Sequence, residues 1–316
     1  MIKFNKDETL FVEKYRPQTV ADCILPAKIK KPFQDIVDQQ KLPNMLLCGT
    51  AGLGKTSIAL ALCEELGYTS YFINASLDNG IDILRTKIRQ FASGNSLHAS
   101  FKVIILDEAD SLTSATQDAL RGFIEEFSKN CRFIFTCNYR NKINSALHSR
   151  CSVVEFNTNK KELQGLCGQF MARALEILKH ENITYEEKVV AELIMLYAPD
   201  WRRVLNEVQR FSTGGELSPS VLSALSSEGV ENLIKIIKAK DFKGMRAWVG
   251  SNSDIDSAAV FRVIYDQLPK FGIDESCLPQ IIVTIGEYQM KAAVVADKEI
   301  NTAAFLTETM AHAKWK

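Results

Sequence analysis

A phosphate-binding loop, Gly49-Thr50-Ala51-Gly52-Leu53-Gly54-Lys55-Thr56, restricts the fold of this chain more than any other feature. The apolar residues 45–48 before it predict a buried strand, and residues 57–63 after it predict a helix. A strand, a glycine-rich loop and a helix N-terminus direct several backbone N–H groups at one point, where a nucleoside triphosphate binds. Lys55 is expected at the terminal phosphates and Thr56 on a Mg²⁺ ion. We assign nucleotide binding to Gly49, Gly52, Leu53, Gly54, Lys55, Thr56 and Ser57.

Further β-like runs follow in the first half of the chain, separated by segments with helical periodicity. These runs are residues 70–73, 103–106, 132–136 and 152–156. Such alternation predicts a parallel sheet with helices on both sides. After Phe156 the strand pattern stops, and the rest of the chain is predicted to be helical, with early helices at 160–181, 185–198 and 201–212.

Two adjacent carboxylates, Asp107 and Glu108, end the apolar run 103–106. Successive residues at a strand end point to different sides, so one can hold a metal ion while the other activates water. We assign Asp107 to Mg²⁺ and Glu108 to the role of general base. Acids at a strand end can also simply lie in solvent, but the phosphate loop upstream favours the catalytic interpretation.

Two more polar residues are candidates for the same reaction. Asn138 follows the run 132–136, and its amide can reach the attacking water or the γ-phosphate. An Asn after a strand is also a common turn residue. Arg150 precedes the last predicted strand, and its planar charge suits the oxygens of a transition-state phosphate. Taken alone it would be an ordinary surface arginine, and the spacing leaves open whether it serves its own nucleotide or a neighbour's.

The composition sets limits on other functions. Of the 316 residues 46% are apolar and 24% charged, and the formal net charge is zero, so any nucleic-acid binding must come from a local patch. Neither a signal peptide nor a membrane-spanning apolar run is visible, and we expect a cytoplasmic protein without membrane contact. The 8 cysteines include no Cys-x-x-Cys pair and are expected to be reduced structural thiols.

Further motifs make the chain resemble a known family. They are Glu13-Lys14-Tyr15-Arg16-Pro17, Asn74-Ala75-Ser76 followed by Gly80-Ile81-Asp82, the acidic box Asp107-Glu108-Ala109-Asp110, Ser149-Arg150-Cys151 and Asp200-Trp201-Arg202-Arg203-Val204-Leu205-Asn206. Together they resemble AAA+ sliding-clamp loader ATPase subunits. The likeness is greatest to the small subunits of replication factor C and to the large subunit of T-even-type phage clamp loaders.

The resemblance implies an α/β class AAA+ ATPase in three domains. These are an α/β nucleotide-binding P-loop domain with a parallel sheet at residues 1–157, a small helical lid domain at 158–228 and an all-α collar domain for oligomerisation at 229–316. Clamp loaders are five-subunit spirals that use ATP and Mg²⁺ to open a ring-shaped polymerase clamp and load it onto primer–template DNA. DNA-stimulated hydrolysis then drives release.

The implied partners are the sliding clamp, primer–template DNA, further copies of the chain and a distinct clamp-loader subunit in a hetero-oligomer. The expected location is the cytoplasm of a phage-infected bacterial host. Another AAA+ DNA-replication ATPase, a helicase loader or a branch-migration motor, is the alternative. A motor normally carries a DNA-binding module at its C-terminus, and the neutral helical ending here argues against one.

The resemblance also implies roles for single residues. Tyr15, Arg16 and Pro17 would line the adenine pocket, Arg202 would sense the γ-phosphate, and Arg150 would be an arginine finger for the adjacent subunit. Asn74 would act as a switch that restrains the catalytic glutamate, although an Asn there can equally be a turn former.

Contacts with DNA and with the clamp are expected from two further segments. The candidates for DNA phosphates are Arg85, Lys87, Arg89, Gln117 and Arg121, although a solvated helix face explains Lys87 and Arg89 equally well. Clamp loaders use apolar residues in the region that here holds Phe91, Leu97 and Phe101. Leu97 is the preferred candidate, because Phe91 and Phe101 fit a core position better.

Overall fold

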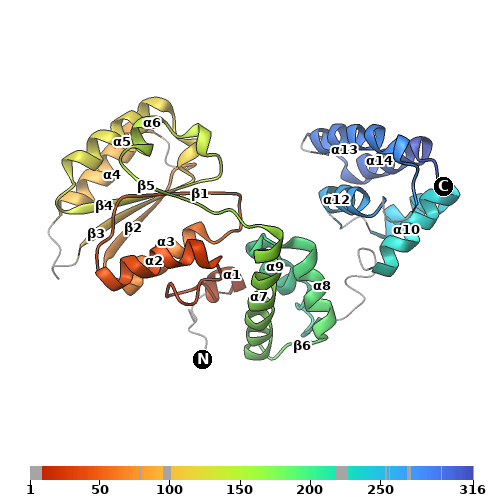
Figure 1. Cartoon of the computed structure of the whole chain (residues 1–316), viewed down its shortest axis with the longest axis horizontal. Coiled ribbons are helices and arrows are strands. Elements are labelled where there is room, and N and C mark those ends of the chain that lie inside the picture. The colour runs from red at the N-terminus through yellow and green to blue at the C-terminus, as the bar shows by residue number, and fades with distance from the viewer. Residues whose placement is uncertain are drawn as a thin grey trace. The chain divides into compact units, whose positions relative to one another are not determined.

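A computed structural model of the chain describes residues 9–77, 80–94, 101–217, 227–252, 255, 257–268, 272–292 and 294–315 (Figure 1). Contacts divide the chain into two compact units, Met1–Leu217 and Ser218–Lys316. The expected boundary between P-loop domain and lid falls inside the first unit, so the three-domain division stays a prediction.

The first unit is built on a parallel five-stranded sheet in the order β2-β3-β4-β1-β5. The strands are β1 (Met45–Cys48), β2 (Thr69–Asn74), β3 (Lys102–Asp107), β4 (Cys131–Cys137) and β5 (Ser152–Glu155). Every β-like run of the sequence is confirmed as a strand. Because the strands are parallel and in register, the phosphate loop after β1 and the polar residues after β3 and β4 emerge at one edge of the sheet.

Helices cover both faces of this sheet (Figure 1). One core joins Met45 and Leu47 of β1 to helices α2 (Ala27–Gln39) and α3 (Lys55–Glu65). The alternate residue Leu46 belongs to the opposite core, with α4 (Ile81–Ser93) and α5 (Ser114–Glu126). This alternation explains why the strands read as continuous apolar runs, since both sides of each pleat are buried.

The first unit also contains short helices and 3₁₀ turns. They are α1 (Phe11–Lys14), the 3₁₀ turns η1 (Ala109–Ser111) and η2 (Arg140–Lys142), and α6 (Ser145–His148). All eight cysteines are free thiols, as expected.

Three helices follow the sheet within the first unit: α7 (Lys160–His180), α8 (Glu187–Tyr197) and α9 (Trp201–Phe211). Asn159 and Glu162 form a capping box that starts α7, and Asp200 caps α9 by accepting from the backbone N–H of Arg203 at 3.0 Å. The expectation of helices alone is incomplete here. A two-stranded pair, β6 (Thr184–Tyr185) and β7 (Glu216–Leu217), closes the bundle, and strands of two residues are too short to show a period in sequence.

The second unit is helical, with α10 (Ser227–Ala239), α11 (Phe242–Ser251), α12 (Ser257–Gln267), the 3₁₀ turn η5 (Glu275–Cys277), α13 (Leu278–Ala292) and α14 (Lys298–His312). Its core contains apolar residues at helical spacing, including Leu233, Ile237, Phe261 and Ile264. An isolated antiparallel bridge joins Ile273 to Trp315. Within the described ranges of the whole chain, no helix has the length and apolar character needed to cross a membrane.

Candidate active site

The phosphate loop is held by its own lysine. Lys55 opens α3 and is only 7% exposed. Its Nζ donates to the backbone carbonyls of Gly49 at 2.7 Å and Thr50 at 2.8 Å, and to Oδ1 of Asn138 at 3.1 Å. Burial lowers the pKa of Lys55, and the nearby charge of Asp107 opposes that shift. The loop after β1 and the residue after β4 are thus joined by one cation.

Two glycines of the loop have left-handed backbones, Gly52 with φ +78° and Gly54 with φ +86°. At Gly52 the bundle also comes very close. A Cβ there would lie 1.8 Å from Oδ1 of Asp200, and the backbone N–H of Trp201 donates to the Gly52 carbonyl at 3.2 Å. The loop therefore touches the start of α9 directly.

A carboxylate at the end of β3 collects two hydroxyl groups. Oδ1 of Asp107 accepts from Thr56 at 2.6 Å and from Thr136 at 2.7 Å. One carboxylate and one hydroxyl beside a phosphate loop are hard oxygen donors, which fit Mg²⁺ held mainly by phosphates and water. Among the described residues, no group of three or more His, Cys, Asp or Glu side chains is arranged to hold a metal ion.

At Glu108, directly after β3, the backbone turns out of the strand direction. The Glu108 φ of +57° is left-handed, and its backbone N–H donates to the Thr136 hydroxyl at 3.1 Å. The backbone turn separates the two carboxylates, and the Thr136 hydroxyl contacts both residues, Asp107 at its carboxylate and Glu108 at its backbone N–H. Thr136 is absent from the sequence-based assignment, although a polar residue near the end of the buried strand β4 is a signal that could have found it.

A single pocket brings together the predicted nucleotide-binding and catalytic residues Tyr15, Arg16, Pro17, Gly52, Leu53, Gly54, Lys55, Thr56, Ser57, Asp107, Glu108, Asn138 and Arg202. Gly49 stands at the end of β1 and reaches the site through its carbonyl, which accepts from Lys55. The pocket lies between the phosphate loop and the helices α7 and α9, all within the first unit.

Apolar side chains to which the sequence analysis gave no role at the nucleotide also line the pocket. Phe170 of α7 stacks on Trp201 of α9, with ring centroids 4.6 Å apart, and Ile177 and Leu25 line the same pocket. A flat apolar wall of this kind suits a nucleobase. Sequence periodicity marks Phe170 and Ile177 as one helix face but does not say which cavity that face meets.

The segment that carries Tyr15 is tied to the helical bundle. Arg173 donates to the Tyr15 carbonyl at 3.2 Å, and the Tyr15 hydroxyl contacts Nδ1 of His180 at 2.6 Å and donates to Glu181. Lys14 forms an ion pair with Glu181 at 2.6 Å. Burial, reinforced by the bond to Glu181, raises the pKa of Tyr15, so its hydroxyl stays a donor. The segment that contains Tyr15, Arg16 and Pro17 is therefore held in place by contacts with α7 and its C-cap.

Asn74 shows the geometry of a turn former. Its Oδ1 accepts from the backbone N–H of Ser76 at 2.9 Å and from the Ser76 hydroxyl at 2.7 Å. Asn74 pairs with Asp107 in the register of β2 and β3, and a second cavity is lined by both Asn74 and Glu108. Its role as a switch stays a prediction.

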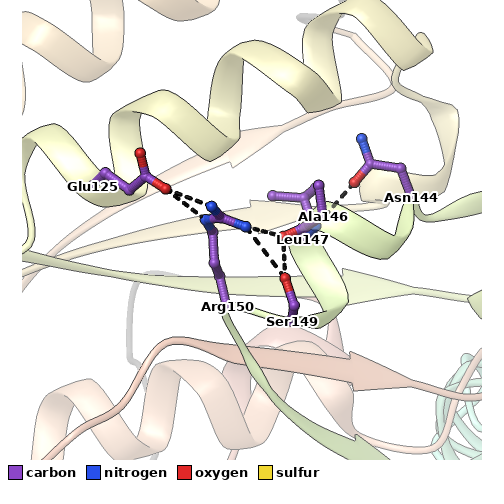
Figure 2. Close-up of polar contacts among 6 residues, drawn as sticks. All are labelled: Glu125, Asn144, Ala146, Leu147, Ser149 and Arg150. Atoms are coloured by element: carbon purple, nitrogen blue, oxygen red, sulfur yellow. Dashed lines mark hydrogen bonds and ion pairs between the residues drawn. The ribbon is translucent and has the colours of Figure 1, made fainter.

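Arg150 is not among the residues that line the nucleotide pocket. It follows α6, whose start is capped by Asn144 accepting from the backbone N–H of Leu147 at 3.0 Å. Figure 2 shows its guanidinium directed at Glu125 of α5, with NH2 2.5 Å from Oε1. Arg150 therefore binds to its own chain away from its own nucleotide site.

The candidate DNA contacts differ in exposure. Arg85 and Arg89 of α4 are exposed, and Lys87 is half-buried. Gln117 does not meet the expectation of a DNA contact, because it is 2% exposed and its amide is used internally. It donates to the carbonyls of Leu112 and Lys142 and accepts from the backbone N–H of Asn144 at 2.8 Å. The helical position alone could not show that Gln117 points inward.

Two of the three candidate clamp contacts pack against other aromatic residues. Phe91 stacks on Tyr71 at 5.2 Å, and Phe101 packs against Tyr68 at 5.5 Å, so both are packing residues as expected. Leu97 lies outside the described residues.

Comparisons with known proteins find a matching family and several similar chains. The family "ATPase family associated with various cellular activities (AAA)" matches residues 45–158. The sliding-clamp-loader large subunit of Enterobacteria phage T4 is 32% identical over 327 residues, and that of Escherichia phage RB69 is 33% identical over 326, with 100% of each chain covered. A replication factor C small subunit of Methanococcus maripaludis is 31% identical over 317 residues, covering 94% of this chain and 97% of the relative.

Among solved structures, the Thermotoga maritima RuvB Holliday junction branch migration motor aligns with a TM-score of 0.53 at 18% identity. The alignment covers 82% of this chain and 92% of that one. At this identity the likeness concerns the fold alone, and it does not favour the motor function over another.

Proposed function

Because this chain belongs to the sliding-clamp-loader ATPases, we propose that its pocket binds ATP with Mg²⁺ and that hydrolysis there controls the loading of a ring-shaped clamp onto primer–template DNA. The observation that carries the proposal is the meeting of Lys55, Thr56, Asp107 and Glu108 in one pocket with a flat apolar wall.

In this proposal each polar group at the phosphate end has one task. Lys55 faces the terminal phosphates and offsets their charge, while Asn138 orients the attacking water or the γ-phosphate. Glu108 accepts the proton of the attacking water. Thr56 and Asp107 would hold Mg²⁺, which when bound stabilises the charge that develops on the phosphate oxygens.

We assign the base of the nucleotide to the part of the pocket lined by the aromatic residues. Tyr15, Arg16 and Pro17 border the adenine on one side, and Phe170 and Trp201 offer a surface for stacking. Arg202 on α9 lines the same pocket, and we assign it to the γ-phosphate. Since α9 also touches Gly52, bound ATP would join the bundle to the phosphate loop.

We assign Arg150 to the nucleotide site of an adjacent subunit. Its position outside its own pocket supports this assignment, and an arginine finger supplied in trans typically raises turnover by about 10³–10⁵. The assembly would be a five-subunit spiral of copies of this chain with a distinct partner subunit, acting in the cytoplasm of an infected bacterium. The bundle 158–228 would be the lid, and the helical unit 229–316 the collar.

The exposed cations Arg85, Arg89 and Arg121 are assigned to DNA phosphates, a mode of binding that is independent of base sequence. Asn74, which borders the same cavity as Glu108, is assigned as a switch on that glutamate.

The Glu108→Gln variant tests the proposal in the complete complex. It should bind ATP with near wild-type affinity and hold clamp and primer–template DNA, yet lose turnover, because an amide cannot accept the proton of water. The matched control is Asp110→Asn in the same acidic box, where the Asp110 carboxylate accepts from the backbone N–H of Tyr139 at 3.2 Å. Wild-type turnover by Glu108→Gln would contradict the assignment.

A further inference from the structure

The guanidinium of Arg150 is almost fully occupied within its own chain (Figure 2). Nε and NH2 both donate to Oε1 of Glu125, at 2.9 and 2.5 Å. NH1 donates to the Ala146 carbonyl at 3.1 Å and to the Ser149 hydroxyl at 3.2 Å. These contacts use most of the five N–H donors that a guanidinium has.

Two of these four contacts are local and neutral, and the two to Glu125 differ from them in kind. Ala146 and Ser149 lie within four residues of Arg150, so they move with it. Glu125 comes from another helix, α5, and is the charged acceptor of the set. A charge-assisted bond with two donors on one carboxylate fixes the direction of the guanidinium as well as its position.

The ion pair is also exposed enough to open. The Arg150 side chain is 32% exposed and that of Glu125 is 59% exposed. Water can replace either partner, so this ion pair orients the guanidinium but can also break readily. A guanidinium engaged with Glu125 cannot at the same time make the charge-assisted bonds that a phosphate requires.

We propose that Glu125 is a positioning residue that holds Arg150 on its own subunit and thereby restrains hydrolysis at the neighbouring site until DNA is bound. The inference rests on the proposed role of Arg150 as a finger in trans. Helix α5 gives it a route to DNA, since Arg121, a candidate phosphate contact, lies four residues before Glu125 on the same helix, and both are exposed. DNA phosphates near this face would repel the Glu125 carboxylate and weaken its hold on Arg150.

The test is the rate of ATP hydrolysis by the complete loader with its clamp, measured without and with saturating primer–template DNA. Glu125→Gln should raise the DNA-independent rate about two- to fivefold, the range expected when a surface ion pair is lost. The rate with saturating DNA and the KM for ATP should stay at wild-type values, so the ratio of stimulation falls.

The matched control is Glu126→Gln, the next residue of α5, which pairs with Arg89 at 3.5 Å instead of Arg150. It removes the same charge and should leave the DNA-independent rate unchanged. The double variant Glu125→Gln/Arg150→Ala should behave like Arg150→Ala alone, because Glu125 acts only through that arginine.

The outcomes distinguish a failure of the Glu125 restraint from a failure of the finger assignment for Arg150. If Arg150→Ala abolishes turnover while Glu125→Gln leaves the DNA-independent rate unchanged or lowers both rates, the restraint by Glu125 is wrong and the finger stands. If Arg150→Ala keeps wild-type turnover, the finger assignment itself fails. A rise in the Glu126→Gln control equal to that of Glu125→Gln would show a general charge effect and also overturn the inference.

Discussion

The hydroxyl of Thr136 on β4 donates to Oδ1 of Asp107 at the end of the neighbouring strand β3, over 2.7 Å. The same hydroxyl accepts the backbone N–H of Glu108 at 3.1 Å. One side chain that is 2% exposed thus positions both the residue assigned to the metal and the residue assigned as general base.

Thr136→Val should therefore impair catalysis although it leaves every side chain assigned to the nucleotide in place. Valine has the shape of threonine but neither donates nor accepts, and a buried N–H left without a partner costs about 1–3 kcal/mol of unfolding free energy. We expect kcat to fall about tenfold, a part of the about 10²–10⁴ that a positioned base contributes. Thr136→Ser keeps the hydroxyl and should keep most of the activity. Equal kcat values for the two variants would contradict the role of Thr136.

Gly52→Ala should separate the phosphate loop from α9. The new Cβ would meet Asp200 at 1.8 Å, and the φ of +78° disfavours alanine. Displacing the cap of α9 moves Trp201 and Arg202, so we expect ATP affinity to fall about tenfold or more, equivalent to about 1.4 kcal/mol. Titration with a fluorescent ATP analogue measures this. Gly122→Ala on α5 is the control, since a Cβ there meets nothing within 4 Å. Wild-type ATP affinity in Gly52→Ala would show that this contact is dispensable.

The tie between the Tyr15 segment and α7 should depend on pH. Burial alone would raise the pKa of Glu181, but the hydrogen bonds from Lys14 and Tyr15 bring that pKa below its usual value. A group with a lowered pKa in the folded state stabilises the fold above its unfolded pKa of about 4.3, and this stabilisation is lost as the pH falls through the folded value.

Glu181→Gln should accordingly lower Tm at pH 7, and the difference from wild type should disappear in acid below about pH 4. Thermal unfolding between pH 3 and pH 8 measures the difference, and Glu176→Gln on α7, the helix that ends just before Glu181, serves as the control. A gap in Tm that stayed constant over this range would rule out the ionised Glu181 as its cause.

Patterns that are local in the chain were sufficient for the sheet, the phosphate loop and the paired carboxylates. The apolar runs of β1, β3 and β4 are short and buried on both faces, so each is visible without knowledge of its neighbours. The strand order then places Lys55 beside Asn138, and Thr56 beside Asp107, as the assignment requires.

What escaped prediction depends on contacts between distant segments. Thr136 acts across two strands, and Phe170 meets Trp201 through the packing of α7 on α9. Gln117 sits on a helix whose polar positions are mostly exposed, and only the backbone of residues 112, 142 and 144 makes it an internal residue. Neither composition nor periodicity contains this information, because it arises from where the helices meet.

The central claim, that this pocket drives clamp loading, is tested most directly by steady-state ATP hydrolysis of the assembled complex. Turnover should be measured alone, with primer–template DNA, with the clamp, and with both. A clamp loader predicts that DNA and clamp together stimulate hydrolysis more than the sum of their separate effects. Hydrolysis that responds to DNA but is unaffected by the clamp would contradict the account and favour a helicase loader or a branch-migration motor.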